Sequence, residues 1–555
     1  MRHPTGRHST EATHERVLRI QSDFAAADLT APWLMCDRHP EEGIAFRFVS
    51  EDLSVEELSY GELRARSERA AAALREHGVQ AGDRVAGLLG KGPDLPALIL
   101  GIWRLGAVYV PLFTAFAATT VGDRIESSDA RVLVTDRQQL PKAEGLRCVV
   151  MLANEDLAAD KEEPTDLFDL SARMRAGERL SEPAPVTGAE VPIVHMFTSG
   201  TTGKPKPVVH PLGYAAGWQS YLELGLAPGG SYWCGADPGW AYGLYTAIVA
   251  PLVSGVPSLL TRGTFQPETT WQILEKFAVT DFAAAPTVYR ALRACDQQLA
   301  LPALQRLSSA GEPLTPEVSE WTQGRFGVPV HDHFGQTEVG MTAGFPHHGD
   351  LRIPPAAGAM GTGLPGWSVT VLKHDSDVVA DPDEVGRLAI SVDRSPFFTF
   401  TGYGVDRSNR ASRFTSAGDH YLTGDLASVD SDGLIRFSSR DDDVILMAGY
   451  RIGPFDVESV LLTHPQVAEC AVVAAPDEVR GEVIHAFVVT TAPGLGEDDA
   501  LATELQNWVR TNYAAHAYPR RVTFVEMLPK TPSGKIQRAV LRQQLRDAAQ
   551  DGTHD

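Results

Sequence analysis

A run of nine residues, Thr198–Lys206, has the composition of a loop that binds phosphate groups. Its sequence, TSGTTGKPK, holds four hydroxyl groups, two glycines and two lysines. Glycine lets backbone N–H groups approach a bound anion closely, and hydroxyl and ammonium groups supply further donors. The run is not a Walker A loop, because that pattern requires glycine at position 198 and a hydroxyl residue directly after Lys204. Taken alone, the run also fits a flexible turn rich in glycine and threonine.

Five more short motifs follow, each with acidic, basic or glycine residues in close spacing. In chain order they are AGEP (Ala310–Pro313), DHFGQTE (Asp332–Glu338), YLTGD (Tyr421–Asp425), the run from Ser439 to Gly453, and PKTPSGK (Pro529–Lys535). Their order and spacing resemble those of the adenylate-forming superfamily, which includes acyl-CoA synthetases, peptide-synthetase adenylation domains and luciferases. The resemblance covers nearly the whole chain.

The resemblance implies an ATP site made of three groups of residues. The phosphate loop would comprise Thr198, Ser199, Gly200, Thr201, Thr202, Gly203, Lys204 and Lys206. Adenine and ribose would be contacted by Gly311, Glu312, Pro313, Asp332, His333, Asp425 and Arg440. A carboxylate such as that of Asp425 suits a ribose because it accepts hydrogen bonds from two hydroxyls. Thr337 would bind phosphate and Glu338 would hold Mg²⁺, a hard cation that prefers oxygen ligands.

The C-terminal motifs imply a reaction in two halves. Lys535 matches the family's catalytic lysine, which bridges the substrate carboxylate and the α-phosphate while the acyl-adenylate forms. Asp442 matches the residue about which the small domain then turns. Gly449 would leave room for the thiol arm of coenzyme A, and Arg451 would contact phosphate or CoA. Standing alone, a lysine in PSGK would be read as a solvated charge.

The identity of the acid is indicated by fewer residues. The stretch Trp233–Trp240 and the run Met447–Val460 look most like the acetyl-CoA and medium-chain acyl-CoA synthetase branch, with Trp240 in the acyl pocket. Acetate-specific members carry a tryptophan at the position of Gly335. An indole replaced by hydrogen would open on the order of 150 Å² of surface to the substrate. We therefore expect a medium-chain, branched or aromatic acid. Pro207 departs from the glycine that many members carry there, which leaves the shape of the loop open.

Alternating strand and helix signals place these motifs on an α/β scaffold. Apolar runs predict strands at Arg84–Leu89 and Ala107–Leu112, with a helix at Asp94–Leu105 that forms a crossover between them. The same signals predict strands at Arg131–Thr135 and Thr280–Ala285, and a helix over Pro286–Leu299. The polar, acidic stretch Glu155–Glu190 is expected to be a surface excursion between core elements.

The chain changes character at the charged run Arg440–Asp443, which predicts a domain boundary. With the resemblance, this gives a large N-terminal domain of stacked sheets with flanking helices over residues 1–441, and a small, mobile α+β domain over residues 442–555. The expected elements of the small domain are a helix Asp456–His464, strands Val467–Ala474 and Glu482–Thr490 with a turn between them, a helix Asp499–Ala514 and a strand Arg521–Glu526.

Composition excludes several classes of protein. Lys+Arg is 49 and Asp+Glu is 71 in 555 residues, a formal net charge of −22. This charge argues against nucleic-acid and anionic-membrane partners. Five scattered cysteines without CxxC spacing predict neither disulfides nor a zinc site. The polar N-terminus and the short apolar run Leu95–Gly106, which Arg104 interrupts, predict a cytoplasmic protein without a membrane span. A homodimer is compatible with the resemblance.

Three alternatives remain open. A peptide-synthetase adenylation domain would need an amine-binding acid in its pocket and a carrier domain, and the sequence shows no carrier motif before Asp555. A luciferase-type oxygenase shares all of these motifs. A non-catalytic relative would be expected to lose Lys535 or Glu338, and both are present. An enzyme that passes its acyl-adenylate to another acceptor than CoA is a further possibility.

Overall fold

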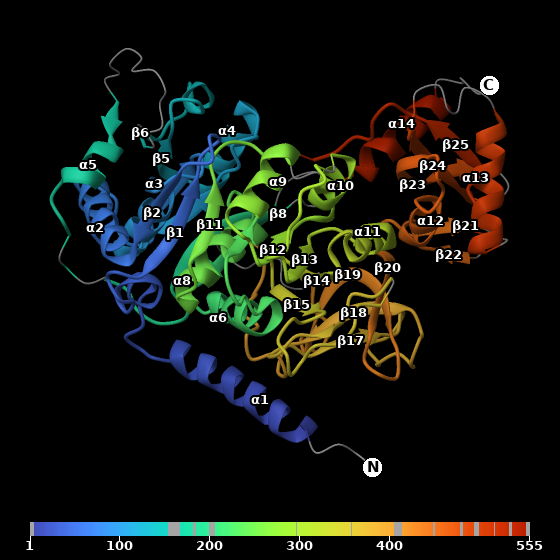
Figure 1. Cartoon of the computed structure of the whole chain (residues 1–555), viewed down its shortest axis with the longest axis horizontal. Coiled ribbons are helices and arrows are strands. Elements are labelled where there is room, and N and C mark those ends of the chain that lie inside the picture. Colours follow the sequence, from blue (N-terminus) through green and yellow to red (C-terminus); the bar gives the residue numbers. More distant parts are fainter. Residues whose placement is uncertain are drawn as a thin grey trace.

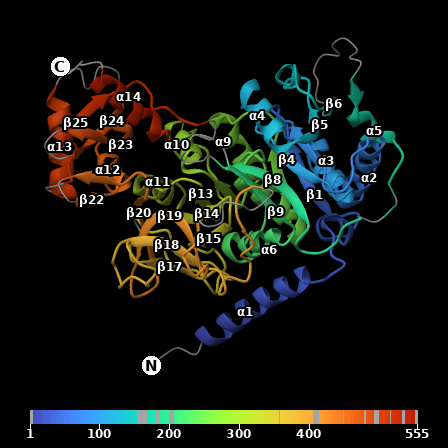
Figure 2. The ribbon, with the colours of Figure 1, turned by 180° about the vertical axis from the view of Figure 1, so that it is seen from behind.

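The computed structural model describes residues 5–153, 167–180, 182, 185–198, 206–295, 297–356, 358–404, 413–447, 450–477, 481–492, 499–514, 517–531 and 536–550. Two bodies of unequal size are visible in Figure 1. The large N-terminal domain contains three sheets, and the small C-terminal domain, coloured orange to red, lies beside α11 and β20. The view from behind in Figure 2 shows the small domain and the seven-stranded sheet at opposite ends of the molecule.

The first sheet has seven strands in the order β7-β6-β5-β3-β4-β8-β9, all parallel except the β8–β9 hairpin. Their bounds are β3 Arg84–Leu88, β4 Val108–Pro111, β5 Ala130–Thr135, β6 Val149–Leu152, β7 Phe168–Asp169, β8 Pro192–Thr198 and β9 Lys206–Pro211. Helix α3 (Asp94–Arg104) joins β3 to β4, and α4 (Ala118–Ser128) precedes β5. The predicted crossover unit is therefore confirmed.

The second sheet has nine strands in the order β16-β15-β14-β13-β12-β10-β11-β1-β2. Their bounds are β1 Ile44–Val49, β2 Val55–Ser59, β10 Tyr232–Cys234, β11 Ser258–Thr261, β12 Asp281–Ala284, β13 Arg306–Ala310, β14 Val330–Gln336, β15 Gly340–Gly344 and β16 Thr362–Gly363. Three helices cross between its parallel strands: α9 Pro267–Lys276, α10 Pro286–Ala294 and α11 Pro316–Phe326. Each begins with proline, whose fixed φ suits the first turn of a helix. The strand and helix predicted around Pro286 are confirmed, with a shorter helix.

Further helices cover the two sheets. They are α1 Thr5–Phe24, α2 Tyr60–Glu76, α6 Tyr214–Ser220, α7 Ala241–Gly243 and α8 Ala250–Ser254, with π-helical turns at Trp33–Asp37, Tyr221–Leu226 and Leu244–Val249 and a 3₁₀ turn at Leu140–Ala143. Helix α1 lies along the outside of the large domain beside α6 (Figure 1). It buries Val17, Ile20 and Phe24 there, so its apolar side chains fix it to the domain.

The third sheet is antiparallel, with strands β17 Val369–Leu372, β18 Gly386–Ser391, β19 His420–Val429 and β20 Ile435–Arg440. Its apolar face packs on the β14–β15 edge of the nine-stranded sheet. Phe334 and Ala343 of that edge share a core with Leu388, Ala427 and Ile435. This packing brings the carboxyl end of β14 against β19, so the DHFGQTE and YLTGD motifs become neighbours.

The small domain contains β21 Ile445–Met447, β22 Tyr450–Ile452, α12 Pro454–Leu461, β23 Val467–Asp477, β24 Gly481–Thr490, α13 Asp499–Asn512, β25 Arg521–Phe524 and α14 Arg538–Gln550. Val457, Leu461, Val472 and Leu505 are fully buried in a core of its own. The predicted helices and strands are present, although β23 extends through part of the predicted turn. Strands β21 and β22 and helix α14 were not predicted. The rotation of this domain about Asp442 stays a prediction.

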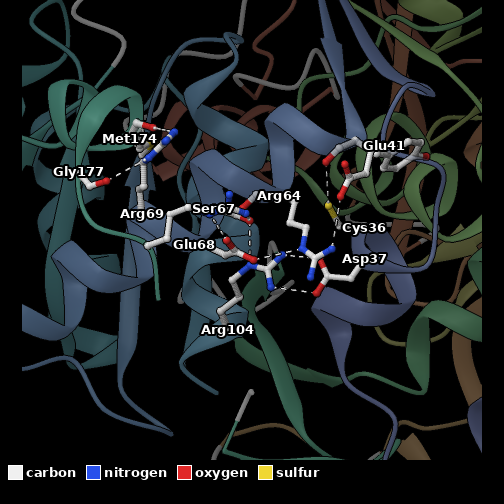
Figure 3. Close-up of polar contacts among 12 residues, drawn as sticks. Cys36, Asp37, Glu41, Arg64, Ser67, Glu68, Arg69, Arg104, Met174 and Gly177 are labelled. Atoms are coloured by element: carbon white, nitrogen blue, oxygen red, sulfur yellow. Dashed lines mark hydrogen bonds and ion pairs between the residues drawn. The ribbon is translucent and has the colours of Figure 1, made fainter. Parts of the chain in front are cut away.

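The stretch Glu155–Glu190 differs in part from its prediction as a surface excursion. Residues 154–166 lie outside the described part of the chain. After them, β7 adds a strand to the sheet, and α5 (Leu170–Ala176) buries Leu170 and Met174 completely. Helix α5 packs beside α2, where Arg69 donates hydrogen bonds to the carbonyls of Met174 and Gly177 (Figure 3). Because the stretch is acidic overall, its composition did not predict that Leu170 and Met174 would be buried.

Arg104, which interrupts the longest apolar run, is itself buried. Its guanidinium donates to both oxygens of Asp37, at 2.6 and 3.0 Å, and to the Ser67 hydroxyl at 2.9 Å (Figure 3). Arg64 lies on the other side of Asp37, at 3.7 Å. A charge in this position is tolerated because it is paired and hydrogen-bonded. The cluster joins α2, α3 and the turn at Trp33–Asp37.

The five cysteines all lie in the described part of the chain, and none forms a disulfide there. Burial raises the pKa of the Cys36 thiol to about 12, which keeps it protonated and unreactive. Within the described residues, no helix is both long and apolar enough to cross a membrane.

Candidate active site

Gln336, the last residue of β14, joins two of the predicted motifs. Its amide nitrogen donates to the Asp425 carboxylate at 2.8 Å and to the Thr423 carbonyl at 2.9 Å. Its amide oxygen accepts a hydrogen bond from the Tyr421 hydroxyl at 2.9 Å. Both ends of one side chain are therefore used to hold the YLTGD strand against the end of β14. Gln336 was not among the predicted site residues.

Asp425 and Arg440, the two predicted ribose contacts, face each other across β19 and β20. The strand register pairs them, and the Arg440 guanidinium donates to Asp425 Oδ1 at 3.0 Å. Asp425 is buried, and this burial raises its pKa, while the charge of Arg440 acts in the opposite direction. The sequence placed these residues fifteen positions apart, and the hairpin brings them into contact.

Glu338 lies two residues beyond the end of β14 and is buried. The Tyr403 hydroxyl donates to Glu338 Oε1 at 2.6 Å, and Arg413 Nε donates to the Tyr403 oxygen at 3.1 Å. The backbone carbonyl of the neighbouring Thr337 is held by the Tyr214 hydroxyl at 2.8 Å and lies 2.7 Å from His210 Nε2. The QTE segment is thus fixed at the Thr337 backbone and at the side chain of Glu338, the residue predicted to hold Mg²⁺.

The two ends of the predicted phosphate loop are paired, while its centre lies outside the described residues. Thr198 ends β8 and pairs with Lys206 at the start of β9. The remaining predicted residues of the loop lie in the part of the chain that is not described: Ser199, Gly200, Thr201, Thr202, Gly203 and Lys204. The Lys206 ammonium lies 5.1 Å from the centre of the Tyr403 ring. The end of the loop and Glu338 therefore contact the same tyrosine.

The AGEP motif follows β13 at the edge where β14 and β12 also end. Gly311 has a φ of +95°, a conformation that favours glycine. The Glu312 carboxylate accepts hydrogen bonds from Thr287 at 2.7 Å and Arg290 at 3.1 Å, both in α10. Because its carboxylate is engaged with α10, Glu312 would contact a nucleotide through its backbone, as would Pro313. Their role toward adenine stays a prediction.

Asp332 and His333 lie inside β14 and are both buried. Burial raises the pKa of Asp332 well above its usual range, and among the described residues its Oδ1 has no hydrogen-bond partner. Burial lowers the pKa of His333 to about 3, and its two ring nitrogens lie 3.1 Å from the Tyr221 hydroxyl and 3.0 Å from the Phe345 carbonyl. His333 is thus a neutral core residue, and contact of this pair with the nucleotide stays a prediction.

The predicted acyl pocket residues lie in two different environments. Trp240 packs against Phe113 and Phe116, with ring centres 5.5 and 5.4 Å apart. Gly335 pairs with β15, and a Cβ built there would lie 2.3 Å from the Gly340 carbonyl oxygen and 2.7 Å from Met341 Sδ. Glycine at 335 therefore permits a close approach of β15. The Met341 side chain occupies the space that a side chain at 335 would take.

The linker after β20 is held to both domains. Arg440 bonds back to Asp425, and Asp442 Oδ1 lies 3.4 Å from Arg440 Nε. Asp443 bonds forward to Arg542 in α14, with Arg538 at 4.0 Å. Gly449 and Lys535 lie outside the described residues, and Arg451 is described only as a member of β22. The roles predicted for these three residues stay predictions.

Tyr421, Gln336, Tyr403 and Arg413 were missed as members of this network. The contacts that define them are between side chains far apart in the sequence, up to 89 residues for Gln336 and Asp425. One local signal was present, because Tyr403 stands between Gly402 and Gly404, and both glycines have positive φ. A tyrosine held between two such glycines is placed by an unusual backbone, which is frequent near binding sites.

Comparison with known proteins agrees with this geometry. The AMP-binding enzyme family matches residues 35–403, and the AMP-binding enzyme C-terminal domain matches residues 456–535. The acetyl-coenzyme A synthetase of Bacillus subtilis (strain 168) is 33% identical over 536 residues, which are 93% of this chain and 90% of the relative. The mitochondrial acyl-coenzyme A synthetase ACSM3 of Mus musculus is 34% identical over 501 residues, which are 87% of this chain and 83% of the relative.

A solved structure extends the match to three dimensions. The crystal structure of a Brucella canis acyl-CoA synthetase is 39% identical, with a TM-score of 0.73, and the match covers 97% of this chain and 99% of that one. Both the large domain with its sheets and the small C-terminal domain lie within the matched length. The chain therefore belongs to the AMP-binding enzyme family and, within it, to the adenylate-forming acyl-CoA ligases.

Proposed function

We propose that this enzyme joins a carboxylic acid larger than acetate to coenzyme A at the expense of ATP, releasing AMP and pyrophosphate. The observation that carries the proposal is the hydrogen-bonded network that links Asp425 to Glu338. Gln336 bonds Asp425 and Thr423, Arg413 bonds Thr423 and Tyr403, and Tyr403 bonds Glu338. The residues assigned to the two ends of a nucleotide are held in one rigid arrangement.

In the first half-reaction, the carboxylate of the acid attacks the α-phosphorus of ATP, pyrophosphate leaves and an acyl-adenylate forms. Asp425 and Arg440 would hold the ribose, while the Thr198–Lys206 loop would surround the phosphates. Lys535 would neutralise charge on the α-phosphate in the transition state, an effect of electrostatic preorganisation. The carboxylate of Glu338 has the hard oxygen donors that Mg²⁺ prefers, so it fits a metal there. Mg²⁺ bound there would neutralise negative charge on the phosphates.

In the second half-reaction, the thiol of coenzyme A attacks the acyl carbonyl and AMP leaves. We assign the domain boundary to residues 441 and 442, with Asp442 as the hinge. The placement of Arg440 in the large domain's β20 and of Asp443 against α14 supports this assignment. Gly449 would border the tunnel for the thiol arm, and Arg451 would contact phosphate or CoA. The proposal includes a cytoplasmic location and assembly as a homodimer.

The proposed acid is a medium-chain fatty acid, a branched acid or an aromatic acid. The aromatic cluster around Trp240 supports an apolar acyl group. No space is open beside Gly335 itself, because the Gly340 carbonyl oxygen and Met341 Sδ would lie 2.3 and 2.7 Å from a Cβ built there. Met341 becomes part of this proposal, because its flexible thioether fills the space beside Gly335. Met341 would then set the depth of the pocket, which Gly335 alone was expected to set.

A pyrophosphate-release screen tests the proposal. The acids are acetate, butyrate, octanoate, benzoate and an amino acid, each with and without coenzyme A. We expect the highest kcat/KM on octanoate or benzoate, with an acyl-CoA product that requires CoA. A preference for acetate, as in the name of the B. subtilis relative, would overturn the proposed class of acid. An acyl-adenylate as the sole product in the presence of CoA would overturn the proposed acceptor.

A further inference from the structure

Tyr403 makes three contacts that join separate parts of the proposed site, and the backbone of its neighbour Gly404 adds a fourth. Its hydroxyl donates to Glu338 Oε1 at 2.6 Å, and its oxygen accepts from Arg413 Nε at 3.1 Å. Its ring lies 5.1 Å from the ammonium of Lys206, and the N–H of the next residue, Gly404, donates to the Pro207 carbonyl at 2.9 Å. The phosphate loop and the QTE segment are thus linked through one residue.

The direction of the hydrogen bonds around the Tyr403 oxygen is fixed. An arginine side chain is always a donor, so the phenol oxygen must accept from Arg413. The single phenol proton is then directed to Glu338, whose carboxylate oxygen accepts it in a short bond. Glu338 Oε1 is held by this bond, which sets the orientation of the whole carboxylate.

Arg413 reaches the same site from a second side. Its NH1 donates to the Thr423 carbonyl at 3.0 Å, in the strand that carries Asp425. The guanidinium therefore connects the β19 strand with the Tyr403 hydroxyl. A guanidinium is suited to this connection because its donors form a rigid fork, which an ammonium group lacks.

We infer that Tyr403 and Arg413 are positioning residues that orient Glu338 toward the metal-bound polyphosphate of the nucleotide, while the Tyr403 ring guides Lys206 to the same phosphates. The inference rests on the proposed function. The residues act through Glu338 and Lys206 and do not themselves touch the reacting atoms. A purely structural role is the competing explanation, because Tyr403 is buried and packs edge-on against Phe400, with ring centres 5.2 Å apart.

Replacement of Tyr403 by phenylalanine separates the two explanations, because the ring, its packing and its contact with Lys206 are retained. Calorimetric titration with MgATP, in the absence of any acid, measures binding without turnover. We expect Tyr403→Phe to weaken MgATP binding about tenfold, the size of one lost hydrogen bond. AMP, which lacks the β- and γ-phosphates, should bind within about twofold of wild type. A magnesium titration at fixed ATP should show a matching shift.

Three further variants complete the design. Tyr232→Phe removes a buried hydroxyl that donates to the Thr246 carbonyl at 3.0 Å, and serves as the matched control with unchanged MgATP affinity. Adding Tyr403→Phe to Glu338→Gln should weaken MgATP binding by no more than about twofold further, because the hydroxyl acts through that carboxylate. Arg413→Lys should give the same selective loss at smaller size, and it replaces Tyr403→Phe if that variant fails to fold.

Failure of the proposed role of Tyr403 and failure of the proposed function give different binding results. Equal loss of MgATP and AMP affinity in Tyr403→Phe, together with a lower Tm, would overturn the inference in favour of a structural role. Tight MgATP binding by both wild type and Tyr403→Phe would overturn it as well, and leave the proposed function intact. A wild-type chain that binds no MgATP would overturn the proposed function itself, and the inference with it.

Discussion

The short linker Arg440–Asp443 has two charged ends that differ in what they bind. At one end, Arg440 bonds to Asp425 in the large domain, and Asp425 shares its other oxygen with the neutral amide of Gln336. At the other end, Asp443 pairs with Arg542 and Arg538 of the small domain. Arg538 also donates hydrogen bonds to Glu458. The first cluster contains one cation and lies in the proposed nucleotide site. The second contains two cations and two acids.

The two clusters also differ in how well the surroundings of Glu458 and of Asp425 replace the water that each carboxylate loses. Glu458 accepts from Arg538 at distances of 2.6 to 3.2 Å and from the Val472 backbone N–H at 2.7 Å. Burial raises the pKa of Asp425, so its surroundings do not fully compensate for the loss of water. We read the Glu458 cluster as complete within the protein, and the Asp425 cluster as one that a ligand's hydroxyls would complete.

The first prediction breaks the cluster that is complete. Glu458→Ala should destabilise the protein by about 3–5 kcal/mol, because it leaves the Arg538 guanidinium partly buried without its main partner. Thermal unfolding should show the loss, with the small domain unfolding first. Glu504→Ala is the matched control, because Glu504 pairs with His464 but is 59% exposed. A Tm equal to that of the control would contradict the assigned structural role.

The second prediction concerns the lysine that the small domain would bring to the site. Lys535→Ala should slow acyl-adenylate formation at least ~100-fold, equivalent to ~2.7 kcal/mol. Thioester formation from a supplied acyl-adenylate should be spared, because the proposed role of the lysine is in the first half-reaction alone. Single-turnover pyrophosphate release and CoA consumption measure the two halves separately. Equal losses in both halves would refute the role.

The third prediction alters the cluster that a ligand would complete. Asp425→Asn should weaken ATP and AMP binding by about 1.5–3 kcal/mol, the range for one hydrogen bond to a charged group. Tm should change little, since the asparagine remains neutral in a buried site that already raises the pKa of the aspartate. Asp377→Asn is the control, because Asp377 lies in the connection between β17 and β18 of the same sheet, pairs with Arg387 and is 42% exposed. Loss of stability without loss of nucleotide affinity would reverse the comparison.

Much of the fold was accessible from the sequence because buried parallel strands are continuous apolar runs. Strands β3, β4, β5 and β12 were predicted on this basis. Strand β22, in contrast, is only three residues long, and α14 presents few apolar side chains, with Leu541 buried in its first turn. Local pattern carries little information on elements of this kind, because the rest of the domain determines where they pack.

The site divides in the same way. The contact of Asp425 with Arg440 follows from a hairpin, and both residues were named in advance. The contacts of Gln336 and Tyr403 depend on how the third sheet packs on β14, which sequence spacing does not specify. Gly335 was named for its missing side chain, yet its closeness to the Gly340 carbonyl appears only when β15 is in place. A prediction made from one residue does not show which atoms of a neighbouring strand fill the space beside it.

The last prediction concerns a second acid close to the Glu458 cluster. Asp456 lies in the first turn of α12, and its Oδ2 accepts from the Tyr513 hydroxyl at 3.3 Å. Burial is the main reason that its pKa rises to about 6, with the charge of Glu458 acting in the same direction. The unfolded value is near ~3.9, so the folded state binds more protons between about pH 4 and pH 6. Stability therefore falls as the pH rises through this window.

Two effects of opposite sign compete at Asp456, and Asp456→Asn measures which is larger. Near pH 7.5 the substitution removes the cost of a buried charge, for which we expect a gain of about 1 kcal/mol after allowing for partial exposure. It also removes a negative charge from a helix N-terminus, a loss of about 0.3–1 kcal/mol. Near pH 4 the aspartate is protonated, so neither effect operates and the two proteins should have nearly equal Tm. If burial dominates, the Tm difference between Asp456→Asn and wild type becomes positive as the pH rises. A lower Tm for Asp456→Asn than for wild type at neutral pH would contradict this. It would mean that the N-terminus of α12 stabilises the Asp456 charge by more than burial destabilises it.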